Sequence, residues 1–343
     1  MTLTPGKLWG MRRMADAGGL FKMTAVDQRP PIKAPIAAHL GVDEAPWEEV
    51  ARFKALLVET LQDLSTAMLL DPHYAIPKAI DTYSPTRGLV VTLEDSVFRE
   101  TPGGRLSSKI DDWSVGRIKR MGSDAVKVLV WYRPDASAET CLAQQDFAKR
   151  IGEACAQHDI PYLFELLVYP LAGGAGATTD YVEMPEKKAD HVLASVEEFA
   201  KPGYGVDVFK LESPVPAKDV LDPGAPGSAA VQARFEEMGR LAGRPWVMLS
   251  AGAGKADFTR ILGHAFRAGA SGFLAGRAIW LDAFKLYPDW EGMRAALLGD
   301  ARRYMSAISD LADQQARPWT DAWPGEARFL PANASFRHGY PEA

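Results

Sequence analysis

Short runs of apolar residues recur along the 343-residue chain, and longer amphipathic stretches separate them. The runs are too continuously apolar for strands with one face in water, so they are typical of strands buried on both faces. Eight candidate strands follow from this pattern, at residues 21–27, 66–71, 89–95, 125–132, 161–169, 208–213, 246–252 and 272–280.

Helical spacing lies between most of these strands. In residues 47–64, the side chains of Val50, Phe53, Leu57 and Leu61 recur at steps of three or four, which places them on one face of a helix. The connection from the second to the third strand leaves room for only about two helical turns near residues 73–81. Strand–helix alternation repeated eight times predicts parallel pairing, and hence an α/β fold, the (β/α)8 TIM barrel. Further helices are predicted at 139–159, 187–201, 229–243 and 255–269.

Three parts of the chain fall outside the regular barrel pattern. We expect an N-terminal segment at 1–20, the barrel at 20–316, and an irregular C-terminal tail at 317–343 that wraps over the surface after about Trp319. Two unusual loops, a small-residue loop at 171–180 and a Pro/Gly-rich loop at 214–228, follow the fifth and sixth strands. Both lie at the carboxyl ends of strands, where a barrel carries its active site.

Composition narrows the class of protein and its location. Lys and Arg total 39 and Asp and Glu total 44, so the net charge is −5, which argues against a nucleic-acid partner. No apolar run is long enough to span a membrane, and the first residues lack the apolar core of a signal peptide, so we expect a cytoplasmic protein. Cys141 and Cys155 suggest neither a disulfide framework nor a zinc site.

Charged residues embedded in the predicted strands are the main chemical signal. Asp27 ends the first strand, and Lys127, Glu165 and Lys210 interrupt the fourth, fifth and sixth. Charged groups are rarely buried unless they are paired, so each one alone could be a structural ion pair or face outward. All four on the inner strands of one barrel predict a shared cavity in which neighbouring groups push their pKa values apart.

Such a set of residues suits imine chemistry. A lysine attacks a ketone only when it is neutral, and both desolvation and a neighbouring cation favour that form. Lys210 and Lys127 fit as nucleophile and neighbour, and Glu165 could transfer protons during carbon–carbon cleavage. The six histidines are scattered without metal-ligand spacing, which argues against a zinc aldolase, so we expect neither a metal nor a cofactor.

Two further segments are typical of a phosphate site. Residues 249–258 join the seventh strand to its helix through small residues, and residues 274–280 end the eighth strand with Gly276 and Arg277. In barrels these two loops frequently bind phosphate through backbone N–H groups and a helix N-terminus, and Arg277 would add a bidentate donor. The alternative is an ordinary glycine turn beside a surface arginine.

Six segments together resemble a known family. They are AVDQR (25–29), DAVKVLVWY (124–132), IPYLFELL (160–167), DVFKLESPV (207–215), LSAGAGKADF (249–258) and AGRAIW (275–280). In order and in position they are similar to the tagatose 1,6-bisphosphate aldolase family, a group of class I, Schiff-base aldolases with a TIM-barrel fold; bacterial sulfofructose-phosphate aldolases belong to the same broad group. The resemblance covers residues 20–315. It implies metal-independent cleavage of a ketose 1-phosphate or 1,6-bisphosphate, by default tagatose 1,6-bisphosphate, to dihydroxyacetone phosphate and an aldehyde.

The resemblance also assigns roles to single residues. Lys210 matches the imine-forming lysine and Lys127 the second lysine of the site. Glu165 matches the carboxylate that transfers protons, and Asp27 an acid that orients substrate hydroxyls. The residues assigned to substrate and phosphate binding are Gln28, Arg29, Ser250, Gly252, Gly276 and Arg277.

The identity of the substrate stays open at this point. The family more often has a glycine and a small residue where this chain continues with Pro30 and Pro31, and the loops at 171–180 and 214–228 also differ. The alternatives are a sulfofructose-phosphate or other variant aldolase, and a non-catalytic phosphosugar-binding protein on the same scaffold. A barrel hydrolase using Glu165 would leave both lysines unexplained. We expect a small sugar phosphate as partner, no nucleic-acid or membrane partner, and a homo-oligomer.

Overall fold

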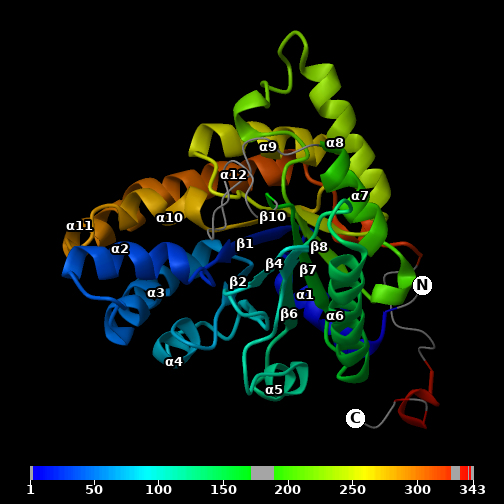
Figure 1. The fold of residues 1–343 in the computed structure, drawn as a ribbon, viewed down its shortest axis with the longest axis horizontal. Helices are drawn as coiled ribbons and strands as arrows, with labels where there is room; N and C mark the ends of the chain where they lie inside the picture. Colours follow the sequence, from blue (N-terminus) through cyan, green and yellow to red (C-terminus); the bar gives the residue numbers. More distant parts are fainter. Residues whose placement is uncertain (1–2, 171–188, 326–332, 339, 341–343) are drawn as a thin grey trace.

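The computed structural model describes residues 3–170, 189–325, 333–338 and 340, and these residues form a closed barrel of eight parallel strands (Figure 1). The order around the barrel is β1, β2, β3, β6, β7, β8, β9 and β10, and β10 pairs with β1 to close it. All eight predicted strands and the TIM-barrel fold are confirmed. The bounds are β1 Phe21–Ala25, β2 Ala67–Leu70, β3 Gly88–Thr92, β6 Ala125–Trp131, β7 Tyr162–Leu167, β8 Val208–Leu211, β9 Trp246–Met248 and β10 Gly272–Ala275.

Helices surround the barrel (Figure 1). Their apolar side chains pack against its outer surface. In α3, Val50, Phe53, Leu57 and Leu61 are all buried, as the spacing predicted. The other four predicted helices and the short one between the second and third strands are also confirmed. The bounds are α1 Pro5–Met14, α2 Pro30–Leu40, α3 Trp47–Leu61, α4 Ala75–Ala79, α5 Val115–Arg120, α6 Ala138–Gln157, α7 Ala189–Phe199, α8 Ser228–Ala242, α9 Lys255–Arg267, α10 Arg277–Phe284, α11 Trp290–Ala296, α12 Arg302–Gln315 and α13 Trp319–Ala322.

The alternation of side chains along each strand decides which residues reach the interior. In β6, Val126 packs between the barrel and its helices, whereas Ala125 packs inside the barrel. Because successive side chains point to opposite faces, Lys127 points inward with Ala125. The same alternation directs Glu165 of β7 and Lys210 of β8 to the inside. The charges that interrupt the apolar runs therefore share one interior.

The eighth strand is shorter than predicted. It ends at Ala275, and residues 277–280 of the predicted strand form the first turn of α10. Gly276 turns the chain, with φ −124° and ψ −87°, and Trp280 and Phe284 then bury one face of the helix. The prediction was wrong here because a short apolar run does not distinguish a buried strand from a buried helix.

A two-stranded antiparallel hairpin, β4 Arg99–Thr101 with β5 Gly104–Leu106, follows β3 and was not predicted. Its strands are short and mostly polar, so they lack the apolar runs that identified the barrel strands. The guanidinium of Arg105 anchors the hairpin over the ends of β6 and β7. It lies 4.1, 4.9 and 5.0 Å from the ring centres of Phe98, Trp131 and Tyr169.

The amino end of the barrel is closed by both ends of the chain. Met11 and Met14 of α1 and Trp319 and Trp323 of the tail pack in one apolar cluster with the inward side chains of the strands. These two tryptophans of the predicted tail are buried. Without these two tryptophans, apolar side chains at the amino end of the barrel would be exposed to water.

The two unusual loops have different outcomes. The loop at 171–180 lies outside the described residues. The loop at 214–228 is described, and α9 anchors it: Arg260 donates to the Val220 carbonyl at 2.8 Å, and the ring of buried His264 contacts the Leu221 carbonyl at 2.9 Å. Among the described helices, none is both long and apolar enough to cross a membrane.

Candidate active site

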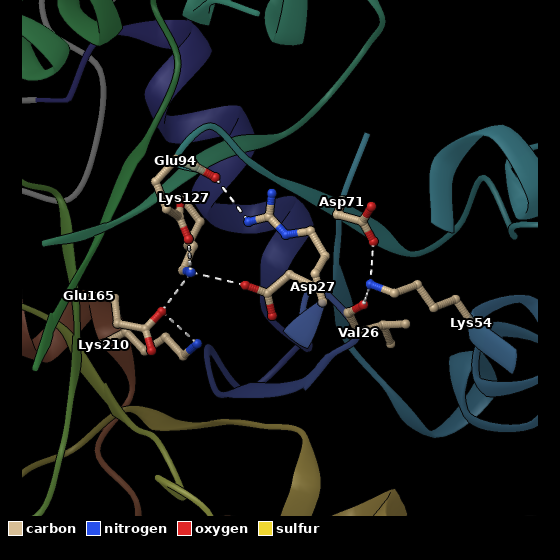
Figure 2. Close-up of polar contacts among 9 residues, drawn as sticks. Val26, Asp27, Lys54, Asp71, Glu94, Lys127, Glu165 and Lys210 are labelled. Atoms are coloured by element: carbon tan, nitrogen blue, oxygen red, sulfur yellow. Dashed lines mark hydrogen bonds and ion pairs between the residues drawn. The ribbon is translucent and has the colours of Figure 1, made fainter. Parts of the chain in front are cut away.

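Five charged side chains meet inside the carboxyl end of the barrel (Figure 2). Asp27 follows β1, Glu94 follows β3, and Lys127, Glu165 and Lys210 come from β6, β7 and β8. Each residue is at most 6% exposed. Charges that are this deeply buried require partners, because desolvation penalises an isolated charge by several kcal/mol.

Lys127 is the centre of the cluster. Its Nζ lies 2.9 Å from Oδ2 of Asp27 and 2.7 Å from Oε2 of Glu165, and it also contacts Oε1 of Glu94. Three carboxylates around one amine strongly favour the charged ammonium form. Lys127 is therefore a fixed positive charge in the floor of the site.

Lys210 has a different environment. Within the part of the chain that the structure describes, its Nζ contacts one carboxylate, that of Glu165, at 2.9 Å from Oε2. The β7–β8 register places Glu165 directly opposite Lys210, so the pairing of the two strands creates this contact. The same oxygen of Glu165 also contacts Lys127, and it thus bridges the two amines. This oxygen lies within hydrogen-bond distance of the Lys210 amine, so a proton can pass between the two groups, and Lys127 holds the carboxylate in place.

The pKa values of Asp27 and Glu94, the other two acids that contact Lys127, are shifted in opposite directions. Burial alone would raise the pKa of Asp27, but the charges of Lys127 and Lys210 outweigh it and hold that pKa below its usual range. Burial raises the pKa of Glu94, and the charge of Lys127 does not compensate it. Asp27 is therefore firmly ionised, and Glu94 holds a proton more readily than an exposed glutamate.

Two adjoining pockets share Gln28, Glu165 and Lys210 in their walls. One pocket extends from Lys210 toward the loops after β9 and β10, where Leu249, Ser250, Gly276 and Arg277 line it. The other extends toward the end of β1, where Asp27, Arg29 and Ser96 line it. Lys210 therefore stands between two compartments, and an arginine lies in the wall of each.

The first compartment has the features of an anion site. Ala251 and Gly252 adopt positive φ angles of 46° and 86°, which turn the chain sharply between β9 and α9. A Cβ atom at Gly252 would lie only 3.4 Å from the guanidinium carbon of Arg277, so glycine lets that side chain lie close over the loop. Arg277 is also the first residue of α10. The free N–H groups of the first turn of a helix and the positive end of its dipole both favour a bound anion.

The structure brings all the predicted site residues to this end of the barrel. Gln28 lines both pockets, and Arg29 lines one of them while its Nη2 donates to the Glu94 carbonyl at 3.0 Å. Ser250, Gly276 and Arg277 line the pocket of Lys210, and Gly252 lies beside Arg277.

Glu94 is the charged member of the cluster that the sequence analysis missed. It lies in the third apolar run, LVVTLED (89–95), which ends in two consecutive acids. An acid at a strand end is commonly a solvated turn residue, so the run alone did not mark it. The signal was the same as for Asp27, an acid directly after a buried strand of the barrel.

A TIM barrel with two buried lysines bridged by a carboxylate at its carboxyl end is the architecture of an enzyme built for carbonyl chemistry. The family model described as DeoC/LacD family aldolase matches residues 21–282. The chain belongs to the DeoC/LacD family of aldolases, and it is therefore a lyase.

Individual relatives agree over nearly the whole chain. A tagatose 1,6-diphosphate aldolase of Listeria monocytogenes serotype 4b is 34% identical over 326 residues, which cover 92% of this chain and 94% of the relative. Tagatose 1,6-diphosphate aldolase 2 of Enterococcus faecalis is 32% identical over 332 residues, which cover 93% of this chain and 97% of the relative. An archaeal fructose-1,6-bisphosphate aldolase, solved with its catalytic lysine bound to a carbinolamine intermediate, superimposes with a TM-score of 0.54 over 89% of this chain and 98% of its own; at 16% identity this supports the fold alone.

Proposed function

We propose that this aldolase acts by a metal-independent, class I mechanism. It forms a Schiff base on Lys210 and cleaves a ketose 1-phosphate or 1,6-bisphosphate to dihydroxyacetone phosphate and an aldehyde. Tagatose 1,6-bisphosphate is the default substrate, because relatives with that name match over nearly their whole length. The observation that carries the proposal is the single Glu165 oxygen that contacts both lysine amines.

The surroundings of the two amines support this assignment of roles. Lys127 is surrounded by three carboxylates and stays an ammonium ion, so it is a poor nucleophile. Among the described residues, Lys210 forms an ion pair with Glu165 only, and it lines the pocket. Transfer of its proton to Glu165 leaves an amine that attacks the C2 carbonyl of the ketose.

The remaining steps use the same carboxyl group. One proton of the attacking nitrogen passes through Glu165 to the former carbonyl oxygen, which gives the neutral carbinolamine. Protonated Glu165 then donates its own proton to that hydroxyl group, which leaves as water and gives an iminium ion on Lys210. The carboxylate then takes the proton of the C4 hydroxyl while the C3–C4 bond breaks, and the electron pair of that bond enters the iminium to form an enamine. Asp27, ionised beside Lys127, holds substrate hydroxyls in place. Protonation at C3 and hydrolysis release dihydroxyacetone phosphate and restore Lys210.

The decisive experiment for substrate class is a panel of sugars in a coupled assay for dihydroxyacetone phosphate. The panel contains tagatose and fructose 1,6-bisphosphates, a ketose 1-phosphate, a sulfonated ketose 1-phosphate and an unphosphorylated ketose. We expect the highest kcat/KM with tagatose 1,6-bisphosphate. A preference for the sulfonated sugar would reassign the substrate, and binding without turnover of any sugar would replace the enzyme with a phosphosugar-binding protein.

Metal independence gives a second expected result. The carboxylates of the site contact lysine amines, and a Schiff base on Lys210 supplies the electron sink that a metal ion would otherwise provide. Cleavage activity should survive extended dialysis against a strong chelator without loss of kcat. Loss of activity that added zinc restores would contradict the imine mechanism.

The phosphate compartment can be tested at Arg277. We expect Arg277→Ala to weaken binding of phosphorylated ketoses by about 1.5–3 kcal/mol, the range of a charge-assisted hydrogen bond, with a much smaller effect on an unphosphorylated ketose. Arg294→Ala is the matched control, because Arg294 makes a bidentate surface pair with Glu59 at 2.6 and 2.8 Å. Equal losses for both kinds of sugar would remove the phosphate role of Arg277.

A further inference from the structure

A second buried ion pair lies directly behind the chain segment that carries Asp27 (Figure 2). Lys54 comes from α3 and Asp71 follows β2, and both side chains are fully buried. The Nζ of Lys54 contacts Oδ2 of Asp71 and donates a hydrogen bond of 2.7 Å to the carbonyl oxygen of Val26. Lys54 lines neither pocket of the active site.

The bond to Val26 lies where the regular pairing of β1 ends. The N–H of Val26 still donates to the Leu69 carbonyl at 2.9 Å, in line with the β1–β2 ladder. Its carbonyl oxygen is held by the ammonium of Lys54, and this carbonyl belongs to the peptide that joins Val26 to Asp27. The orientation of that peptide sets the direction in which the Asp27 side chain leaves the backbone.

Asp71 in turn holds Lys54. Its other oxygen, Oδ1, accepts backbone N–H groups of His73 and Tyr74 at 2.9 and 2.8 Å, so the carboxylate is fixed by the chain after β2. Burial lowers the pKa of Lys54, and the negative charge of Asp71 opposes that loss of the proton. Removal of Asp71 would thus leave Lys54 without its main electrostatic support.

Stability is a weak reason for such a pair. Desolvation of two buried charges commonly cancels their attraction, and apolar residues of similar volume are often as stable. The position of this ion pair is better explained if the pair acts on a catalytic group, Asp27, through the backbone. The positive charge of Lys54 also helps to lower the pKa of Asp27, in addition to the charges of Lys127 and Lys210. The neighbouring Glu94 does not share this effect, because its pKa is raised.

We propose that the Lys54–Asp71 pair is a positioning device for Asp27 in the cleavage reaction. It fixes the Val26–Asp27 peptide from outside the barrel, so that the Asp27 carboxylate meets both Lys127 and the substrate. The inference rests on the proposed function only in that Asp27 acts on the substrate. Lys54 and Asp71 themselves line neither of the two pockets around Lys210.

The test uses the double variant Lys54→Met/Asp71→Asn, which removes both charges and conserves volume. Asparagine retains an oxygen for the N–H groups of His73 and Tyr74. We expect kcat for cleavage to fall about 10- to 100-fold, the cost of a small displacement of a catalytic group, with KM changed less than about threefold. Should the double variant fail to fold, Lys54→Met alone removes the hydrogen bond to the Val26 carbonyl while Asp71 keeps the N–H groups of His73 and Tyr74 as partners, and it should give the same fall in kcat.

A matched control lies at the other end of the barrel. Lys7 and Asp207 also form a largely buried pair, at 2.7 Å, and Asp207 also accepts a backbone N–H, from Tyr162 at 2.8 Å. We expect Lys7→Met/Asp207→Asn to lower the melting temperature and leave kcat unchanged. An equal loss of kcat in this control would mean that any buried pair merely stiffens the barrel, and it would overturn the inference.

Combining Lys54→Met/Asp71→Asn with Asp27→Asn shows whether the ion pair affects kcat through Asp27. If the pair acts through Asp27, the Lys54→Met/Asp71→Asn changes should cost almost nothing further in kcat in the Asp27→Asn background. A full additional 10- to 100-fold loss there would show that the pair does not act through Asp27. If Asp27→Asn by itself leaves kcat unchanged, the role of Asp27 in the proposed function fails instead, and the two failures are thereby distinguished.

Discussion

Borohydride added together with dihydroxyacetone phosphate should fix one ligand per chain on Lys210. The amine of Lys210 contacts one carboxylate and lines the pocket, so it can form an imine with the ketone, and the hydride reduces that imine to a stable secondary amine. Mass spectrometry of the intact chain measures the stoichiometry, and peptide mapping locates the adduct. Lys210→Met should abolish both labelling and turnover.

Lys127→Met is the informative companion variant. It removes the fixed charge between Asp27, Glu94 and Glu165 and leaves the nucleophile in place, so the reaction should slow while some adduct still forms. Labelling that persists in Lys210→Met and maps to Lys127 would mean that the two amines have exchanged roles. Intact turnover without any labelling would remove Schiff-base catalysis altogether.

Glu165→Gln should lower kcat by about 10²–10⁴-fold, the usual contribution of a positioned acid–base group. Glutamine conserves the shape of the side chain and cannot accept the proton of Lys210 or of the substrate hydroxyl. Single-turnover experiments should show slower formation of the trapped adduct as well as slower cleavage, because the same oxygen serves both steps. Steady-state and quenched-flow kinetics measure the two effects.

Glu94→Gln is the matched comparison for that variant. Glu94 contacts Lys127 and no reacting amine, and burial already raises the pKa of its carboxyl group. A neutral amide in its place should therefore cost much less than the change at Glu165. If Glu94→Gln instead lost as much kcat as Glu165→Gln, protons would have to reach the substrate through Glu94 and Lys127.

The sequence by itself determined the architecture, because its dominant signals are local. Eight apolar runs separated by helical spacing are enough to specify a barrel, since strands buried on both faces have few other solutions. Charged residues inside such apolar runs could also be recognised from the sequence as candidates for a polar site. Lys127, Glu165 and Lys210 had to face a polar interior or find partners, and the structure shows that they do both.

Local patterns gave less information where two structures share one pattern. Residues 278–280 are apolar and would suit a buried strand as well as a buried helix, and it is their packing in the core between the barrel and its helices that places them in the first turn of α10. Trp319 and Trp323 looked like part of a polar, proline-rich tail. They are buried because they cover the apolar side chains at the amino end of the barrel, and that apolar surface exists only after the strands have formed the closed barrel.

The tertiary structure alone decided how the charges are shared. Asp27, Glu94 and Glu165 are far apart in sequence, and it is the barrel that brings all three to Lys127, whereas Glu165 alone of these three forms an ion pair with Lys210. Lys54 lies in the amphipathic helix between two residues of the predicted apolar face, and nothing in that spacing links it to Val26. Contacts of this kind depend on strand register and closure, which bring residues together across distances that no periodic pattern along the chain encodes.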